Sequence, residues 1–338
     1  DVLTWVFSRL TNSMIRDIKS HKYIPCEAYY CKFPQIKGDR VTFIGSTFMK
    51  IGEKDQYLNH MAVVGECSDI PEVPNRKIDQ YKTEKAMLLG WSKLIRKEDP
   101  DVIIGYNTFG FDWAFMIDRS IERQCLDQFL SMSKIKDKKA HVKNTSTTVA
   151  SGTYELRYAK IQGRVQLDLY NHFRKNANLN SYKLDNVAAV YIGDTVKEYK
   201  YNENEDSTTI KSKNLFGLKN GHYISFELIG HSSDMYNDGQ KFSIFDLKED
   251  EFKVKGQLII NQKYSKLRWC LNKDDITLEE MFNANTPDKR AKVAKYCYQD
   301  CNLVHNLFIK NDIYTEFCEM ANLCSVPLDY IIMRGQGI

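Results

Sequence analysis

The 338-residue chain contains 43% hydrophobic and 27% charged residues, which is typical of a folded globular protein and excludes a disordered one. Its length suits two ordinary domains, or one large domain with an insertion. With 17 Gly and 7 Pro, collagen-like and low-complexity chains are excluded as well. The 48 basic and 44 acidic residues give a net charge of +4, too balanced to indicate a nucleic-acid partner by itself. No apolar run approaches the roughly 20 residues needed to cross a bilayer, so no membrane partner is expected.

The chain starts at Asp1 with neither an initiator Met nor the pattern of a signal peptide, which suggests a fragment cut from a longer chain. Its nine cysteines form an odd set with no Cys-x-x-Cys pair, so we expect reduced intracellular thiols rather than disulfides. Cys297 and Cys301 lie one helical turn apart, a spacing that would suit a metal. Because no second Cys/His pair is nearby in the sequence, we expect these two residues to pack in a core.

The first third of the chain alternates strand and helix patterns after a short N-terminal remnant at 1–23. The pattern predicts a strand at 41–48, a strand at 60–64, a helix from Thr83 to just before Asp99, a strand at 102–106 and a helix at about 112–123. This order of elements indicates an α/β fold.

The middle of the chain is less regular. The residues predict a polar loop at 136–151, strands between 154 and 169, a mainly helical stretch at 179–192, a solvated linker at 202–206 and a small β-rich insertion at 212–262. Helices return from Thr277, and Thr286 followed by Pro287 is typical of a helix start. That helix is predicted to run to about Lys310, and another covers 313–323.

Asp112 stands where the buried strand at 102–106 has ended and a helix begins. Free backbone N–H groups at a helix start stabilise a carboxylate as an anion, so Asp112 could hold a metal ion. The plainer alternative is an ordinary N-terminal capping Asp. Tyr296 and Asp300 lie four residues apart on one helix face, where a phenol beside a carboxylate could hold a metal-bound water. The plainer alternative there is a Tyr–Asp surface hydrogen bond.

The two segments together are more specific than either alone. Carboxylates that converge from separate elements are what a two-metal phosphodiester hydrolase requires, because divalent cations held by oxygens activate water and neutralise the leaving oxygen. Two carboxylates are few for two metals, so at least one more is expected on a strand edge near the N-terminus.

Several motifs carry a family resemblance. Residues 99–107 (Asp-Pro-Asp-Val-Ile-Ile-Gly-Tyr-Asn), followed by Phe111-Asp112, resemble the second exonuclease motif of family B DNA polymerases. Residues 296–300 (Tyr-Cys-Tyr-Gln-Asp) resemble the third, Tyr-x-x-x-Asp. Further similar blocks, in the family's order, are Gly163–Asp168 and Ser181–Leu184 of the delta-type branch, Gly217–Ile224 of large nucleocytoplasmic DNA virus polymerases, and the junction blocks Ser325–Leu328 and Arg334–Gly337.

The resemblance implies a ribonuclease H-like fold and 3′→5′ proofreading with Mg²⁺ or Mn²⁺. It implies metal binding by Asp112 and Asp300, water positioning by Tyr296, and a pocket for the frayed 3′ end shaped by Asn107 and Phe111. Asp168 is expected to brace its strand rather than bind metal. The implied partners are primer–template and single-stranded DNA, the remainder of the polymerase chain, and a sliding clamp or other processivity factor, in the nucleus or at a viral replication site.

The expected domain plan is an exonuclease domain at 24–195 and 263–323, a linker and β-rich insertion at 196–262, and a junction to a polymerase region at 324–338. The family's first motif, Asp-x-Glu shortly before Phe-Pro, is incomplete. Counting back from Phe33 reaches Glu27, which we take as the catalytic and metal-binding carboxylate, but Pro25 replaces the Asp. The other candidate, Asp17, lies further upstream, and Lys19 stands where the motif has Glu.

Three explanations of this incomplete motif stay open: a naturally impaired nuclease, a deliberate substitution, or residues missing near 22–26. The alternative function is a non-catalytic module that binds single-stranded DNA or acts as a scaffold within the polymerase. A free-standing nuclease is a third hypothesis.

Overall fold

The computed structural model describes residues 38–53, 55–149, 152–230, 232–260, 264–272 and 276–334. The chain divides into two compact units, 1–39 and 40–338, and the fold described below is that of the second unit. The predicted N-terminal remnant at 1–23 and Glu27 lie outside the described residues.

The first sheet contains three strands, β1 (Phe43–Phe48), β2 (Leu58–Val64) and β3 (Arg76–Tyr81). β1 and β2 pair antiparallel, as the two predicted strands suggest, and β3 adds to β2 in parallel. The sequence pattern misses β3, because its polar residues resemble those of a surface loop.

Helix α3 (Glu84–Glu98) begins where the sequence predicts, because the Thr83 side chain accepts a 3.2 Å hydrogen bond from the Ala86 N–H. It ends at Asp99, whose left-handed backbone closes the helix. Its buried face packs with α4 (Trp113–Glu122), α5 (Leu126–Phe129) and the β1–β2 pair in one hydrophobic cluster.

Two parallel strands form the second sheet. β4 (Val102–Gly105) pairs with β7 (Val165–Asp168), and the last residues of the two strands, Gly105 and Asp168, lie opposite each other. Between β4 and α4 the chain makes a turn of π-helix, η2 (Thr108–Asp112). The carboxyl ends of a parallel strand pair therefore meet at the residues that resemble the second motif.

The prediction of a polar loop at 136–151 is wrong for residues 141–149, which form a strand. β5 (His141–Val149) and β6 (Gly152–Lys160) form a long antiparallel hairpin in which His141 pairs with Lys160 and Val149 with Gly152. The Thr and Ser residues of β5 look like loop residues in composition, but Thr is β-branched and pairing with β6 satisfies the backbone. Val142 and Leu156 also pack against the cluster around α3 and α4.

The remaining helices are α6 (Leu169–Asn176), α7 (Leu184–Tyr191), α8 (Leu278–Phe282), α9 (Pro287–Lys310), α10 (Ile313–Cys324) and α11 (Leu328–Arg334). The Thr286 side chain caps α9 by accepting from the Lys289 N–H, with Pro287 at the first position, as the sequence predicts. α9 packs against β1, β2 and β4, so one helix contacts both sheets.

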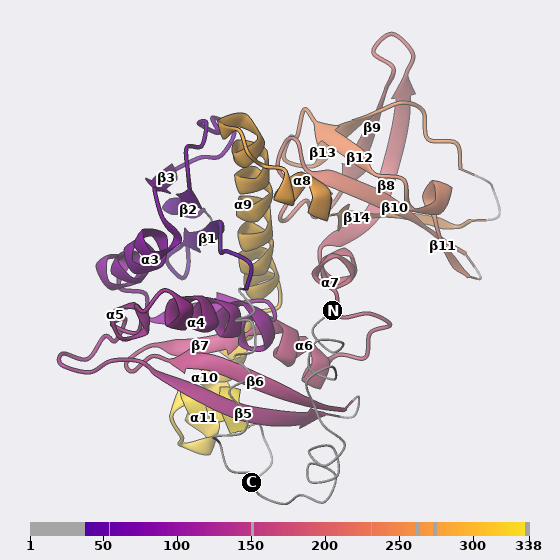
Figure 1. Cartoon of the computed structure of the whole chain (residues 1–338). Helices are drawn as coiled ribbons and strands as arrows, with labels where there is room; N and C mark the ends of the chain where they lie inside the picture. The colour runs from indigo at the N-terminus through magenta and orange to yellow at the C-terminus, as the bar shows by residue number, and fades with distance from the viewer. Residues whose placement is uncertain are drawn as a thin grey trace, which may run out of the picture. The chain divides into compact units, whose positions relative to one another are not determined.

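A closed β-barrel follows α7 (Figure 1). Its strands are β8 (Gly193–Asn202), β9 (Ser207–Ser212), β10 (Tyr223–Ile229), β12 (Phe242–Phe245), β13 (Glu251–Lys255) and β14 (Lys266–Asn272), in the order β10-β12-β13-β9-β8-β14, and β14 pairs back to β10. The short strand β11 (Ser233–Met235) extends one edge of β10, before the turn η3 (Tyr236–Gly239).

The barrel differs in its bounds from the expected insertion at 196–262. It begins at Gly193 and ends at Asn272, and the stretch expected to be a linker at 202–206 is the turn between β8 and β9. Its interior side chains include Phe226, Phe252 and Trp269, which are almost fully buried. Among the described residues, no helix is both long and apolar enough to cross a membrane.

Candidate functional site

Asp168 holds the turn that follows β4. Its carboxylate accepts hydrogen bonds from the backbone N–H groups of Asn107 (2.7 Å), Phe109 (2.9 Å) and Tyr170 (3.0 Å). The bond to Tyr170 caps α6, and the other two fix η2. Asp168 therefore braces the turn after β4 and the start of α6, whereas the sequence predicted that it would brace its own strand.

The same turn needs an unusual backbone. Asn107 has a left-handed conformation with φ of 59°, and its side-chain oxygen would lie 2.5 Å from a Cβ atom added at Gly110. Only glycine fits at position 110 without moving Asn107. The segment is thus shaped by contacts that the sequence spacing alone does not show.

Two phenylalanines of η2 point in different directions. Phe109 is buried and stacks on Tyr158, with ring centroids 4.3 Å apart. Phe111 is 61% exposed and stacks on Phe115 at 5.9 Å. Phe109 therefore anchors the turn, while Phe111 offers an aromatic face to solvent next to Asp112.

The Asp112 carboxyl group ends this turn. Solvent reaches its atoms, but the surrounding protein removes much of their hydration, and this desolvation together with the charge of Asp168 raises the pKa of Asp112 to about 6. Burial also raises the pKa of Asp168 to about 6, against the lowering effect of its backbone hydrogen bonds. Two neighbouring carboxyl groups with raised pKa values indicate a place where added positive charge would be favourable.

The residues that resemble the third motif lie on α9. Tyr296 and Asp300 are one helical turn apart, and both are partly buried. Burial and the nearby Cys297, Asp300 and Asp112 raise the pKa of the Cys301 thiol. The carboxyl groups of Asp112 and Asp300 therefore lie within electrostatic reach of the same sulfur, although they are far apart in the sequence.

The two cysteines on this helix pack as the sequence predicts. A Cβ atom added at Gly45 of β1 would lie 3.2 Å from the Cys301 sulfur and 3.5 Å from Cβ of Cys297. These cysteines thus set the close approach of α9 to β1, and the described cysteines are all free thiols.

The donor chemistry fits a hard divalent cation, because Asp112 and Asp300 supply carboxylate oxygens. Within the described residues, no group of three or more His, Cys, Asp and Glu side chains is arranged to hold a metal. The expected third carboxylate, Glu27, lies outside the described part of the chain.

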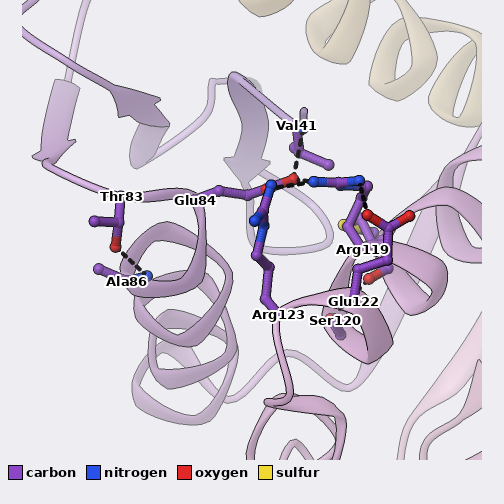
Figure 2. Close-up of polar contacts among 9 residues, drawn as sticks. Val41, Thr83, Glu84, Ala86, Arg119, Ser120, Glu122 and Arg123 are labelled. Carbon is purple, nitrogen blue, oxygen red and sulfur yellow. Dashed lines mark hydrogen bonds and ion pairs between the residues drawn. The ribbon is translucent and has the colours of Figure 1, made fainter. Parts of the chain in front are cut away.

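A buried ion-pair network fixes the helix that follows Asp112 (Figure 2). Glu84 of α3 accepts two 2.8 Å bonds from Arg119 of α4, one of 2.7 Å from Arg123, and one of 2.9 Å from the Val41 N–H. Arg119 also donates to Glu122 at 2.5 Å. The sequence did not predict this network, because an acidic residue in the first turn of a helix, such as Glu84, is usually exposed to solvent.

Comparison with known proteins places the chain in a family. Residues 23–187 match the family model described as DNA polymerase family B, exonuclease domain. A DNA polymerase of Phaeocystis pouchetii virus is 39% identical, over 90% of this chain and 31% of its own length. A DNA polymerase of Pyramimonas orientalis virus is 35% identical, over 90% of this chain and 24% of its own length.

A DNA polymerase delta catalytic subunit, that of Candida albicans, is 25% identical over 93% of this chain and 23% of its own length. The chain belongs to DNA polymerase family B, as a region that carries the exonuclease domain of that family. It spans between 23% and 31% of the length of these three relatives.

Proposed function

We propose that the chain is the 3′→5′ proofreading exonuclease region of a DNA polymerase that acts in DNA replication. Its substrate would be the 3′ end of a DNA strand, and the reaction would be hydrolysis of the terminal phosphodiester with Mg²⁺ or Mn²⁺. The observation that carries the proposal is that α9, which bears Tyr296 and Asp300, packs against β4, and β4 leads directly into the turn η2 that ends at Asp112. Convergence of carboxylates from separate elements is what a metal-dependent phosphodiesterase needs.

Asp112 and Asp300 would hold the divalent ions, with Glu27 as a third carboxylate. When bound, such ions activate water and neutralise charge on the leaving 3′ oxygen. Tyr296, one turn before Asp300, would orient the attacking water through its phenol. Asp168 would contribute by holding the turn that positions Asp112, through its bonds to Asn107 and Phe109.

The DNA strand would be held through stacking and backbone contacts. The exposed Phe111 ring, supported by Phe115, offers a platform for an unstacked base, and Asn107 at the other end of the turn would shape the pocket. A mispaired 3′ end frays at lower cost than a paired one, which would give the site its selectivity. Binding of this kind tolerates many sequences and weakens as salt rises.

We also propose a ribonuclease H-like core for this region. The packing of α9 against β1, β2 and β4 supports it, because one helix then covers both the antiparallel and the parallel strand pairs. The partners we propose are primer–template and single-stranded DNA, the remainder of the polymerase chain and a processivity factor.

The test compares trimming of a mismatched 3′ end by the unsubstituted chain and by Asp112→Ala, across a range of Mn²⁺ concentrations. We expect the unsubstituted chain to shorten the mismatched strand and the variant to lose this activity. Robust trimming that Asp112→Ala leaves unchanged would show that the residues are wrongly assigned. Binding of single-stranded DNA without cleavage at any Mn²⁺ concentration would instead support the non-catalytic module.

A further inference from the structure

The barrel shares a hydrophobic core with the C-terminal half of α9. Leu303 and Leu307 of α9 belong to the same buried cluster as Ile224 of β10 and Leu271 of β14. These side chains are almost completely buried, so the barrel covers a face of α9 that would otherwise be apolar and exposed. The covered face begins one turn after Asp300.

The loop between β9 and β10 makes a second contact with α9. Gly217 has a φ of +83°, and a Cβ atom there would lie 3.3 Å from the Asn306 amide nitrogen and 3.2 Å from the side chain of Ile192. The Lys310 ammonium lies 5.7 Å from the centre of the Phe216 ring. The loop therefore contacts α9 along its last turn, from Asn306 to Lys310.

A recess of about 30 Å³ lies between the barrel and the Asp300 turn of α9. Its walls include His222 next to β10, Asn272 of β14, and Gln299, Asp300 and Asn302 of α9. Three buried atoms of residues that line it, His222 Nδ1, Gln299 Oε1 and Asn302 Oδ1, have no hydrogen-bond partner among the described residues. The volume suits one water molecule, and a buried water generally bonds to two to four polar atoms of this kind.

We propose that the barrel positions the Asp300 side of the nuclease site, and that His222 acts as a positioning residue through a water that donates its two hydrogens to His222 Nδ1 and Asn302 Oδ1. This proposal rests on the proposed exonuclease function. The apolar contacts at Leu303 and Leu307 hold the helix against the barrel, and the polar side chains in the recess fix the rotation of the turn that carries Asp300. His222 suits this role because burial and the nearby Lys219 lower its pKa to about 4, which keeps the ring neutral.

The test replaces His222 and follows both catalysis and local opening. We expect His222→Leu to lower kcat on a 3′-mismatched primer–template with Mn²⁺ by about tenfold or more, since small misplacements of a reacting group cost this much or more. KM for DNA should stay within a factor of two. Amide hydrogen exchange over residues 295–306 should become several-fold faster, a readout that needs neither metal nor DNA.

Two further variants and a control separate positioning from general damage. His222→Gln, which keeps a polar side chain in the recess, should recover most of the rate, and Asn302→Leu should repeat the loss from the opposite wall. Lys200→Ala, at an exposed position of β8, should leave both readouts unchanged. Melting temperatures establish that each variant is folded. If His222→Leu does not fold, Asn302→Leu replaces it in the test.

The possible failures are distinguishable. An unsubstituted chain that does not cut DNA overturns the proposed function, and with it this inference. Cleavage by the unsubstituted chain with an unchanged kcat in His222→Leu and Asn302→Leu overturns the inference alone. Faster amide exchange at an unchanged kcat also overturns it, because the barrel would then support the fold without positioning Asp300.

Discussion

Asp168 accepts a 2.9 Å hydrogen bond from the backbone N–H of Phe109, which lies 59 positions earlier in the chain. This bond places the Asp168 carboxylate next to the turn that carries Asp112. The carboxylate oxygens accept hydrogen bonds from backbone N–H groups. A buried carboxylate used in this way is a structural part of the candidate site.

Asp168→Asn tests this role, because the amide replaces one acceptor oxygen with a donor that faces backbone N–H groups. Asp168 is 1% exposed, so we expect the free energy of unfolding to fall by about 1–3 kcal/mol, the usual cost of an unsatisfied buried polar group. Urea unfolding measures this change. Asp127→Asn is the control, since Asp127 is exposed and pairs with Lys139 in a surface contact at 2.6 Å. Equal stability of the two variants would contradict the bracing role.

The ion-pair network at Glu84 predicts a larger effect. Glu84→Gln leaves the Arg119 guanidinium, whose side chain is 1% exposed, without its buried counter-charge. Breaking a buried pair in this way typically costs about 3–5 kcal/mol. Glu122→Gln removes the more exposed partner of the same Arg119 and should cost much less. Chemical unfolding of both variants measures the difference, and similar losses would argue against a dominant role for Glu84.

The same network predicts a dependence of stability on pH. Burial alone would raise the pKa of Glu84, but hydrogen bonds from Arg119, Val41 and Arg123 lower it from 4.5 to about 2. A carboxyl with a depressed pKa in the folded state contributes stability above its unfolded pKa and loses it as the pH falls. The gap in unfolding free energy between the wild type and Glu84→Gln should therefore narrow from pH 4.5 toward pH 2.

Asp112 and Asp168 also titrate in acid, but they are present in both proteins and cancel in this difference. A gap that stays constant over the window would show that the pKa of Glu84 is not depressed.

The contrast between Phe109 and Phe111 gives a matched pair of variants. Phe111→Ala should change the unfolding free energy by only about 0.5 kcal/mol, as is usual for exposed positions, and weaken single-stranded DNA binding by about 1–3 kcal/mol through lost stacking. Phe109→Ala removes a buried ring and should destabilise the fold by about 3–5 kcal/mol. Thermal melts and fluorescence titrations with an oligonucleotide measure the two effects. Unchanged DNA binding by Phe111→Ala would remove this residue from the proposed pocket.

Local signals in the sequence predicted the elements whose ends are set by neighbouring residues. The Thr83 cap and the Thr286-Pro287 start gave the first turns of α3 and α9, because each cap bonds to a residue only three positions away. The β-branched and aromatic pattern of β1 and the apolar run of β4 were equally clear, since such residues favour strands and a strand buried in a core carries continuous hydrophobic residues.

Features that depend on distant partners were missed or misplaced. β5 looks like a loop until β6 pairs with it, and the barrel extends beyond 196–262 because β8 and β14 are joined by pairing across the inserted segment. The candidate site shows the same limit. The sequence indicated Asp112 and Asp300. It did not indicate the hydrogen bond between Asp168 and Asn107 or the ion pair between Glu84 and Arg119, because the partners are 61 and 35 positions apart.

The pairing of β8 with β14 has a consequence for how such a chain can change. Gly193 lies opposite Cys270, so the backbone leaves the α/β part and returns to it at neighbouring points. An inserted segment whose two ends are adjacent can be gained, lengthened or exchanged with little change to the structure of the surrounding domain. Here the barrel also covers Leu303 and Leu307, so removing it would expose an apolar surface on α9 and favour aggregation.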